Sequence, residues 1–105
     1  MELFKNLIYE YKKGIRDLAL YTCSKSQLPI YTNLLKTLKT KYKTQNAGYD
    51  KINLFFGNPL CLKILDQFSS KELNKISHYE DFILGIMLGY SRDEQYRRIL
   101  NHFSK

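Results

Sequence analysis

The chain has 105 residues, 44% hydrophobic and 26% charged, values typical of one folded domain and too apolar for wholesale disorder. Its formal net charge at pH 7 is +7. The longest apolar run, residues 82–90, is far shorter than the ~20 residues that a membrane-spanning helix needs. The N-terminus mixes charged residues into its apolar positions, unlike a secretory signal. We therefore expect a single domain over residues 1–105, with no membrane segment.

The chain offers few groups for catalysis or metal binding. Cys23 and Cys61 are too few and too widely spaced for a disulfide framework or a zinc site, and such usage is typical of the reducing cytoplasm. His78 and His102, the only histidines, have no partner at metal-ligand spacing. We expect a cytoplasmic protein that is not an enzyme, with no catalytic residue, no metal and no cofactor.

The first half of the sequence predicts two helices and a strand. The first helix ends at Gly14, and a strand follows over residues 18–23. The second helix starts at the cap Ser26, with Pro29 in its first turn. Its apolar positions form one stripe: Leu28, Tyr31, Leu34, Leu35, Leu38 and Tyr42.

Two short strands are predicted next, at residues 44–48 and 51–57, joined by a tight turn. In the second of them, Ile52, Leu54 and Phe56 alternate with Asn53 and Phe55. One face of that strand is therefore expected to be buried, while the other presents an aromatic side chain.

The second half of the sequence is helical. Asn58 and Pro59 start a helix whose inner face is expected to hold Leu60, Ile64 and Phe68, and short turns follow at residues 70–76. Capping boxes then open two more helices, at Ser77 with Glu80 and at Ser91 with Glu94. The former helix is apolar nearly all round, which predicts burial on several sides. The latter is expected to turn four apolar side chains inward: Tyr96, Ile99, Leu100 and Phe103.

This order of elements predicts an α+β fold. A strand–helix–strand unit favours a right-handed parallel crossover, and the tight turn then adds an antiparallel strand. The expected architecture is a small three-stranded mixed sheet with about five helices packed on it.

The positive charge is concentrated in one third of the chain. Residues 18–49 hold five lysines and no carboxylate. Lys36, Lys39 and Lys43 gather on one arc of the second predicted helix, away from its apolar stripe. This basic face is predicted to bind an acidic protein partner through long-range electrostatics.

Two alternatives to an acidic protein partner stay open. A nucleic acid could bind the same lysines with the help of aromatic side chains that no core face claims, such as Tyr9, Tyr21 and Tyr49. A small ligand or substrate could instead bind near Cys61 or the Phe55 face. No nucleic-acid-binding motif accompanies the lysines, so an acidic protein is the favoured partner.

A homodimer is expected because the sheet has free edges and the chain has surplus aromatic residues. Phe55, next to Phe56, is the candidate interface residue, and a free strand edge is the alternative. Gly85 and Gly89 form a GxxxG spacing outside a membrane segment, which predicts close approach of another backbone, either inside the core or across a homodimer interface.

Three stretches carry a resemblance to a known family: residues 8–22, residues 53–57 (NLFFG) and residues 80–90 (EDFILGIMLGY). Together they resemble a domain-of-unknown-function family of small, uncharacterised bacterial proteins, and the last stretch is the most specific. The resemblance implies an α+β fold with three strands and about five helices and a homodimer. Members of this family are sometimes encoded near flavodoxins, which are strongly acidic, so a flavodoxin-like protein is a candidate for the acidic partner. The resemblance assigns no functional residue.

Overall fold

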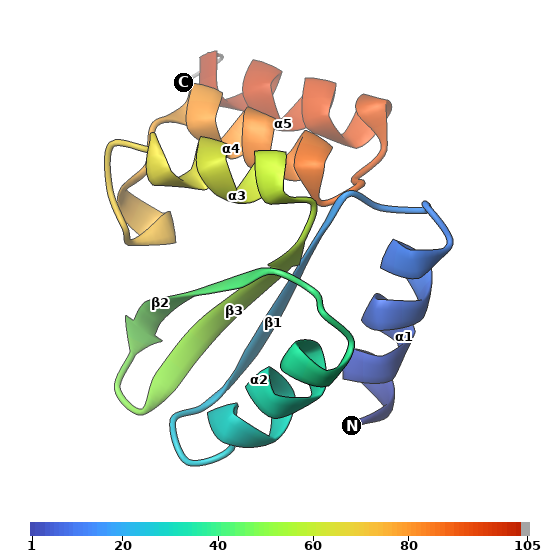
Figure 1. Cartoon of the computed structure of the whole chain (residues 1–105). Helices are drawn as coiled ribbons and strands as arrows, with labels where there is room; N and C mark the ends of the chain where they lie inside the picture. The colour runs from blue at the N-terminus through green and yellow to red at the C-terminus, as the bar shows by residue number, and fades with distance from the viewer. Residues whose placement is uncertain (104–105) are drawn as a thin grey trace.

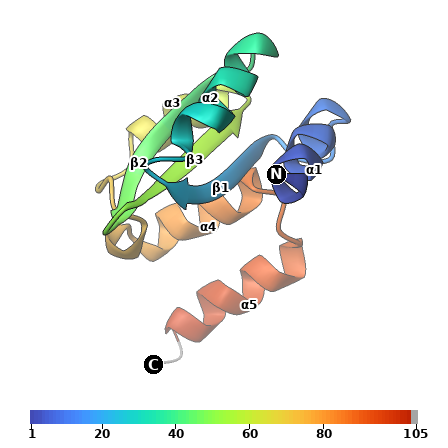
Figure 2. The same ribbon diagram turned by 90° about the horizontal axis from the view of Figure 1, so that it is seen from below.

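The computed structural model describes residues 1–103 and has a three-stranded sheet between two helical layers (Figure 1). Helices α1 and α2 cover one face, α3 and α4 cover the other, and α5 lies outside against α4 (Figure 2). The elements are α1 (Glu2–Lys12), β1 (Leu18–Ser24), α2 (Leu28–Thr37), β2 (Tyr42–Gly48), β3 (Lys51–Gly57), α3 (Pro59–Asp66), a 3-10 turn η1 (Leu73–Lys75), α4 (His78–Met87) and α5 (Arg92–Phe103).

The α+β class with three strands and five helices is confirmed, but the expected mixed sheet is wrong. The strand order is β1-β3-β2, and both pairings are antiparallel. β1 and β2 lie on opposite sides of β3 instead of pairing with each other through a parallel crossover. Because β3 pairs with a strand along each edge, its backbone groups are hydrogen-bonded on both sides, and residues 53–57 are all buried.

The alternating residues of β3 supply both hydrophobic cores. Phe55 packs with α3 and α4 on one face, while Leu54 and Phe56 pack with α1 and α2 on the other. Phe55 and Phe56 are both fully buried. Every helix except α5 is thereby fixed to the sheet through one of these two cores.

Helix α2 ends at Thr37, earlier than the apolar stripe predicts. Lys39 adopts a left-handed backbone with φ of +56°, and the Thr40 amide donates to the Leu35 carbonyl at 2.9 Å. The chain then starts β2 at Tyr42, whose side chain still packs against the core on the α1/α2 face. The apolar stripe is therefore satisfied by a helix and a strand together.

The expected inner face of α3 is wrong at two of its three positions. Leu60 and Ile64 are exposed, and only Phe68, just after the helix, lies in the core as expected. Cys61 and Leu65 are buried against the sheet instead. α3 has apolar residues on more than one side, so periodicity does not define which side faces the sheet.

Gly85 and Gly89 have different roles at the end of α4. A Cβ on Gly85 would lie 2.1 Å from Oε1 of Gln95, so the close neighbour at Gly85 is a side chain of α5 and not the expected backbone. Gly89 has φ of +84°, and the Tyr90 amide donates to the Gly85 carbonyl at 3.0 Å. This pattern is that of a glycine C-cap, and it stops α4 at Met87.

The end of α4 is also tied to the opposite helical layer. Arg16, in the connection between α1 and β1, donates from Nη1 to the Leu88 carbonyl at 2.7 Å. Its Nη2 donates to the Glu10 carboxylate at 3.2 Å. One side chain therefore links α1 to the C-terminus of α4.

Gly89→Ala is expected to lower the free energy of unfolding by about 1–2 kcal/mol, because a left-handed backbone is strained for any residue with a Cβ. Urea unfolding measures this change. Gly14→Ala is the control, because Gly14 has φ of +79° and open space around its Cβ position. It should lose a similar amount. A Gly89→Ala variant as stable as wild type would contradict the role of Gly89 as a helix stop.

Candidate interaction surface

The three lysines predicted to form one basic helix face do not share a helix. Lys36 lies in the last turn of α2, Lys39 follows its end, and Lys43 lies in β2. The Lys43 ammonium forms a hydrogen-bonded ion pair with Asp66 at the end of α3, and this contact lowers the pKa of the Asp66 carboxyl. The expected single arc is wrong because α2 ends before it reaches Lys43.

A smaller group of lysines surrounds the turn between α2 and β2. Lys36, Lys39 and Lys41 line a shallow hollow of about 420 Å³ together with Thr40 and Tyr42. In the described part of the chain these three ammonium groups have no carboxylate within ion-pair distance. This lysine cluster is what remains of the predicted basic face.

Phe55 is wrong as a dimer-interface residue. Its side chain is fully buried within the chain, beneath α3 and α4. The prediction required the Phe55 face of β3 to be uncovered, which would need the helical second half of the chain to pack elsewhere. Because α3 and α4 cover it, any surface available to a second copy must lie on other residues.

The outer side of α4 and α5 carries the largest group of exposed apolar residues. On α4 they recur at helical spacing, at Tyr79, Ile83 and Ile86, and Tyr90 follows after the turn at Gly89. On α5 they do the same: Tyr96, Leu100 and Phe103. We call these seven residues the α4–α5 face. The prediction that α5 turns its apolar side inward is wrong for Tyr96, Leu100 and Phe103, because all three are exposed.

The two stripes of the α4–α5 face lie on the same side of the helix pair. The helices run antiparallel, and each stripe is offset from the line of contact, marked by Gly85 and Gln95, by a similar angle on the helical wheel. When two helices are antiparallel, residues displaced from the line of contact by the same angle, in the same rotational sense, lie on the same side of the helix pair. The rings of Tyr79 and Phe103, whose centroids are 6.1 Å apart, join the stripes.

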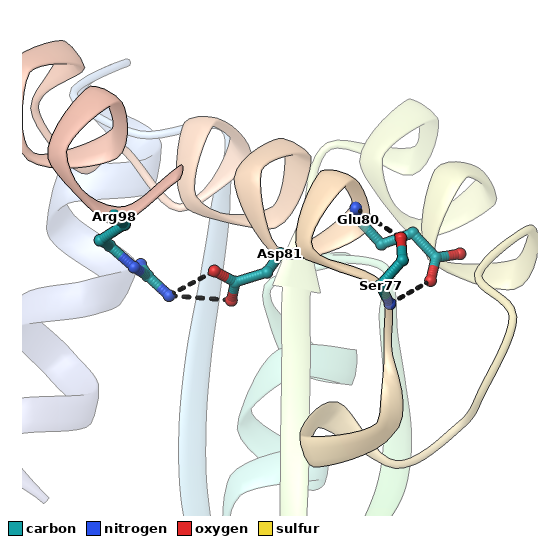
Figure 3. Close-up of polar contacts among 4 residues, drawn as sticks. All are labelled: Ser77, Glu80, Asp81 and Arg98. Carbon is teal, nitrogen blue, oxygen red and sulfur yellow. Dashed lines mark hydrogen bonds and ion pairs between the residues drawn. The ribbon is translucent and has the colours of Figure 1, made fainter. Parts of the chain in front are cut away.

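The contact between α4 and α5 is largely polar. Gln95 lies against Gly85, and Arg98 donates from Nη2 to both carboxylate oxygens of Asp81 at 2.7 and 2.8 Å (Figure 3). The Arg98 guanidinium also lies 5.5 Å from the centre of the Tyr90 ring. Because α5 docks through these groups, its apolar side stays exposed. The signal for this face in the sequence was the α4 segment, in which apolar residues occur on more sides of the helix than one core can cover.

The cysteines and histidines lie at separate places in the fold. Cys23 and Cys61 are buried in different cores, and burial raises the pKa of both thiols. His78 and His102 stack at 3.7 Å between ring centroids, a contact that their sequence separation did not reveal. Among residues 1–103, no three His, Cys, Asp or Glu side chains gather in a way that could hold a metal ion.

Glu80 has a structural role. Its carboxylate accepts hydrogen bonds from the amide and the hydroxyl of Ser69. It also accepts from the Ser77 amide, while the Ser77 hydroxyl accepts from the Glu80 amide (Figure 3). These bonds lower the pKa of Glu80 to about 2, and the bond from the Ser69 side chain has the largest effect. The predicted capping box at Ser77 is confirmed, and the carboxylate also ties the segment after α3 to the start of α4.

The arrangement defines a small α+β protein whose distinctive features are an exposed apolar helix pair and a separate lysine cluster. The chain belongs to the family described as "Protein of unknown function (DUF2023)", whose model matches residues 2–102. This confirms the resemblance to a domain-of-unknown-function family. A comparison with curated proteins gives no match. No helix within residues 1–103 is long and apolar enough to cross a membrane.

Glu80→Gln is expected to reduce the dependence of stability on pH in the acid range. A folded-state pKa of about 2, below the ordinary 4.5, means that the Glu80 contribution is present above pH ~4.5 and is lost as the pH falls toward 2. Urea midpoints measured across this range should fall less steeply in the variant than in wild type. Glu94→Gln, at the matching position of α5, is the control. Identical pH profiles for Glu80→Gln and wild type would contradict this role.

Proposed function

We propose that this protein is a non-enzymatic interaction module that forms a homodimer through the α4–α5 face and binds an acidic protein through the lysine cluster. The observation that carries the dimer is the exposure of seven large apolar side chains on one side of two adjacent helices. Single exposed apolar residues are ordinary on protein surfaces, but a contiguous group is typical of an interface.

The size of the α4–α5 face suits a second copy. The seven side chains are 41–61% exposed. If each offers on the order of 100 Å² of surface, the face amounts to roughly 700 Å² per chain, close to the ~800 Å² that each partner buries in a standard interface. It also exceeds the ~300–600 Å² of the largest apolar patch on a typical monomer.

The composition of the α4–α5 face favours a second copy over an acidic protein. None of its seven residues carries a charge, so it offers no electrostatic complement to a carboxylate-rich partner. The apolar side of this antiparallel helix pair can pack against the same side of the pair in a second copy, related by a two-fold axis. The result is a four-helix bundle. Such packing would bury all seven side chains symmetrically.

The double variant Ile83→Glu/Tyr96→Glu is expected to abolish the dimer, because each interface would then bury four carboxylates without partners. Sedimentation equilibrium at tens of micromolar should give twice the 12.5 kDa chain mass for wild type and the single chain mass for the variant. Leu3→Glu/Ile30→Glu, on exposed positions of α1 and α2, is the control and should stay dimeric. A monomeric wild type, or a dimeric Ile83→Glu/Tyr96→Glu variant, would reject this interface.

The proposal of an acidic partner is based on a different surface, the lysine cluster. The lysine cluster lies at the end of α2, on the opposite side of the sheet from α4. Its charges stand within the 32-residue stretch 18–49, which contains no carboxylate, so the local field is positive. By family resemblance a flavodoxin-like protein is the candidate partner. The acidic protein and the second copy of the chain can therefore bind at the same time.

Replacing Lys36, Lys39 and Lys41 with Glu is expected to abolish binding to a flavodoxin at low salt, because attraction becomes repulsion. Biolayer interferometry with a purified flavodoxin and with a single-stranded oligouridine compares the two candidate partners. The control variant places Glu at Lys5 and Lys12 of α1 and at Lys13 just after it, with the same change in net charge, and should retain binding. Binding of the oligouridine alone would favour the nucleic-acid alternative. If wild type binds neither, the lysines are a solvated surface and the proposed partner is wrong.

A further inference from the structure

The side chain of Gln95 is buried without a hydrogen bond. It is 1% exposed, and neither Oε1 nor Nε2 has a hydrogen-bond partner among the described residues. Burying an amide with both of its polar atoms unpaired costs free energy, so buried amides are usually hydrogen-bonded. The position of Gln95 on α5 therefore needs an explanation beyond packing.

Gln95 lies at a hollow between α4 and α5. The hollow has a volume of about 320 Å³, within the ~300–1,000 Å³ range of small-molecule sites. Its lining combines flat or apolar side chains with polar ones: His78, Asp81, Phe82, Gln95, Arg98, Ile99, Asn101 and His102. Gln95 is the most deeply buried of them. Gln95 thus lines a hollow of ligand size, and its amide lies beside the hollow against Gly85, with both polar atoms closed to solvent.

The chemistry of the lining points to a flat heterocycle with a neighbouring donor and acceptor. A glutamine amide offers one acceptor and two donors in a plane, and it pairs with adenine in a bidentate manner. Phe82 and the His78–His102 stack supply planar surfaces against which a base can lie. The Arg98 guanidinium is held by Asp81, so it brings little uncompensated charge to the hollow.

We propose that the hollow between α4 and α5 binds the adenine base of a nucleoside through the carboxamide of Gln95. The exocyclic amino group of adenine donates to Oε1, and a ring nitrogen accepts from Nε2. The ribose then lies toward the exposed rim, where Asn101 and His102 are found. Binding satisfies both polar atoms of the amide at once.

The amide can reach such a ligand by rotating about its side-chain torsions. In the unliganded chain it lies against Gly85, where a Cβ would come within 2.1 Å of Oε1. It holds no hydrogen bond there, so leaving this position breaks none. Because Gly85 lacks a side chain, the amide has a place to rest next to the hollow.

This site shares no residue with the proposed dimer interface. On the helical wheels, Asp81 and Arg98 project to the other side of the helix pair from the α4–α5 face. His78, His102 and Arg98 adjoin the rings of that face but do not belong to it. Nucleoside binding and dimer formation can succeed or fail separately.

The test is titration of the isotope-labelled full-length protein with adenosine, guanosine, cytidine and uridine, followed by amide chemical shifts. Adenosine is expected to perturb Phe82, Gln95, Arg98 and Ile99, and to bind at least tenfold more tightly than cytidine or uridine. Adenosine 5′-monophosphate is included to show whether a phosphate contributes. Shift changes confined to other residues, equal binding of all four nucleosides, or no binding at millimolar concentration would overturn the proposal.

Gln95→Leu separates recognition from folding. Removing the unpaired amide is expected to raise the melting temperature by about 4–8 °C while weakening adenosine binding at least tenfold. Gln45→Leu is the matched control, because Gln45 is 7% exposed and its Oε1 also lacks a partner, but it lies in β2. It should gain stability and keep adenosine binding. Gln95→Met serves if Gln95→Leu fails to fold. Unchanged adenosine affinity in a folded Gln95 variant would overturn the proposal.

Discussion

The packing of β3 on both of its faces is the constraint on which the other elements depend. Phe55 and Phe56 are neighbours in sequence, so their side chains point to opposite faces of the sheet, and each is fully buried. A strand with this requirement must have helices on both faces of its sheet. The two helical layers follow from it.

This constraint also explains why α4 has an apolar surface to spare. One side of α4 fills the core above Phe55 with Leu84, Met87 and Leu88. The sheet cannot cover the opposite side of the same helix, and α5 meets α4 through Gly85, Gln95 and the Arg98–Asp81 pair instead. A helix that is apolar nearly all round therefore remains half exposed in the single chain, which is the physical basis for proposing a second copy.

Three surfaces with different chemistry are thereby separated in a chain of 105 residues. The lysine cluster is charged and lies on the α2 side of the sheet, while the α4–α5 face is uncharged and belongs to helices on the other side of it (Figure 2). The hollow beside Gln95 lies on the other side of the helix pair from that face and is lined by polar and planar groups. Each surface suits a different kind of partner, so the proposed interactions do not compete for the same residues.

The sequence by itself determined the elements, the α+β class and the capping box at Ser77, because these depend on local periodicity and on side chains a few residues apart. It could not determine that β3 separates β1 from β2, because strand order depends on which faces other elements cover. For the same reason it placed Phe55 at the surface and put Lys43 on one helix with Lys36. The α4–α5 face and the unpaired Gln95 were decided only by the tertiary structure, since the side of α5 that meets α4 is chosen by close packing on Gly85, not by the apolar repeat of α5 itself.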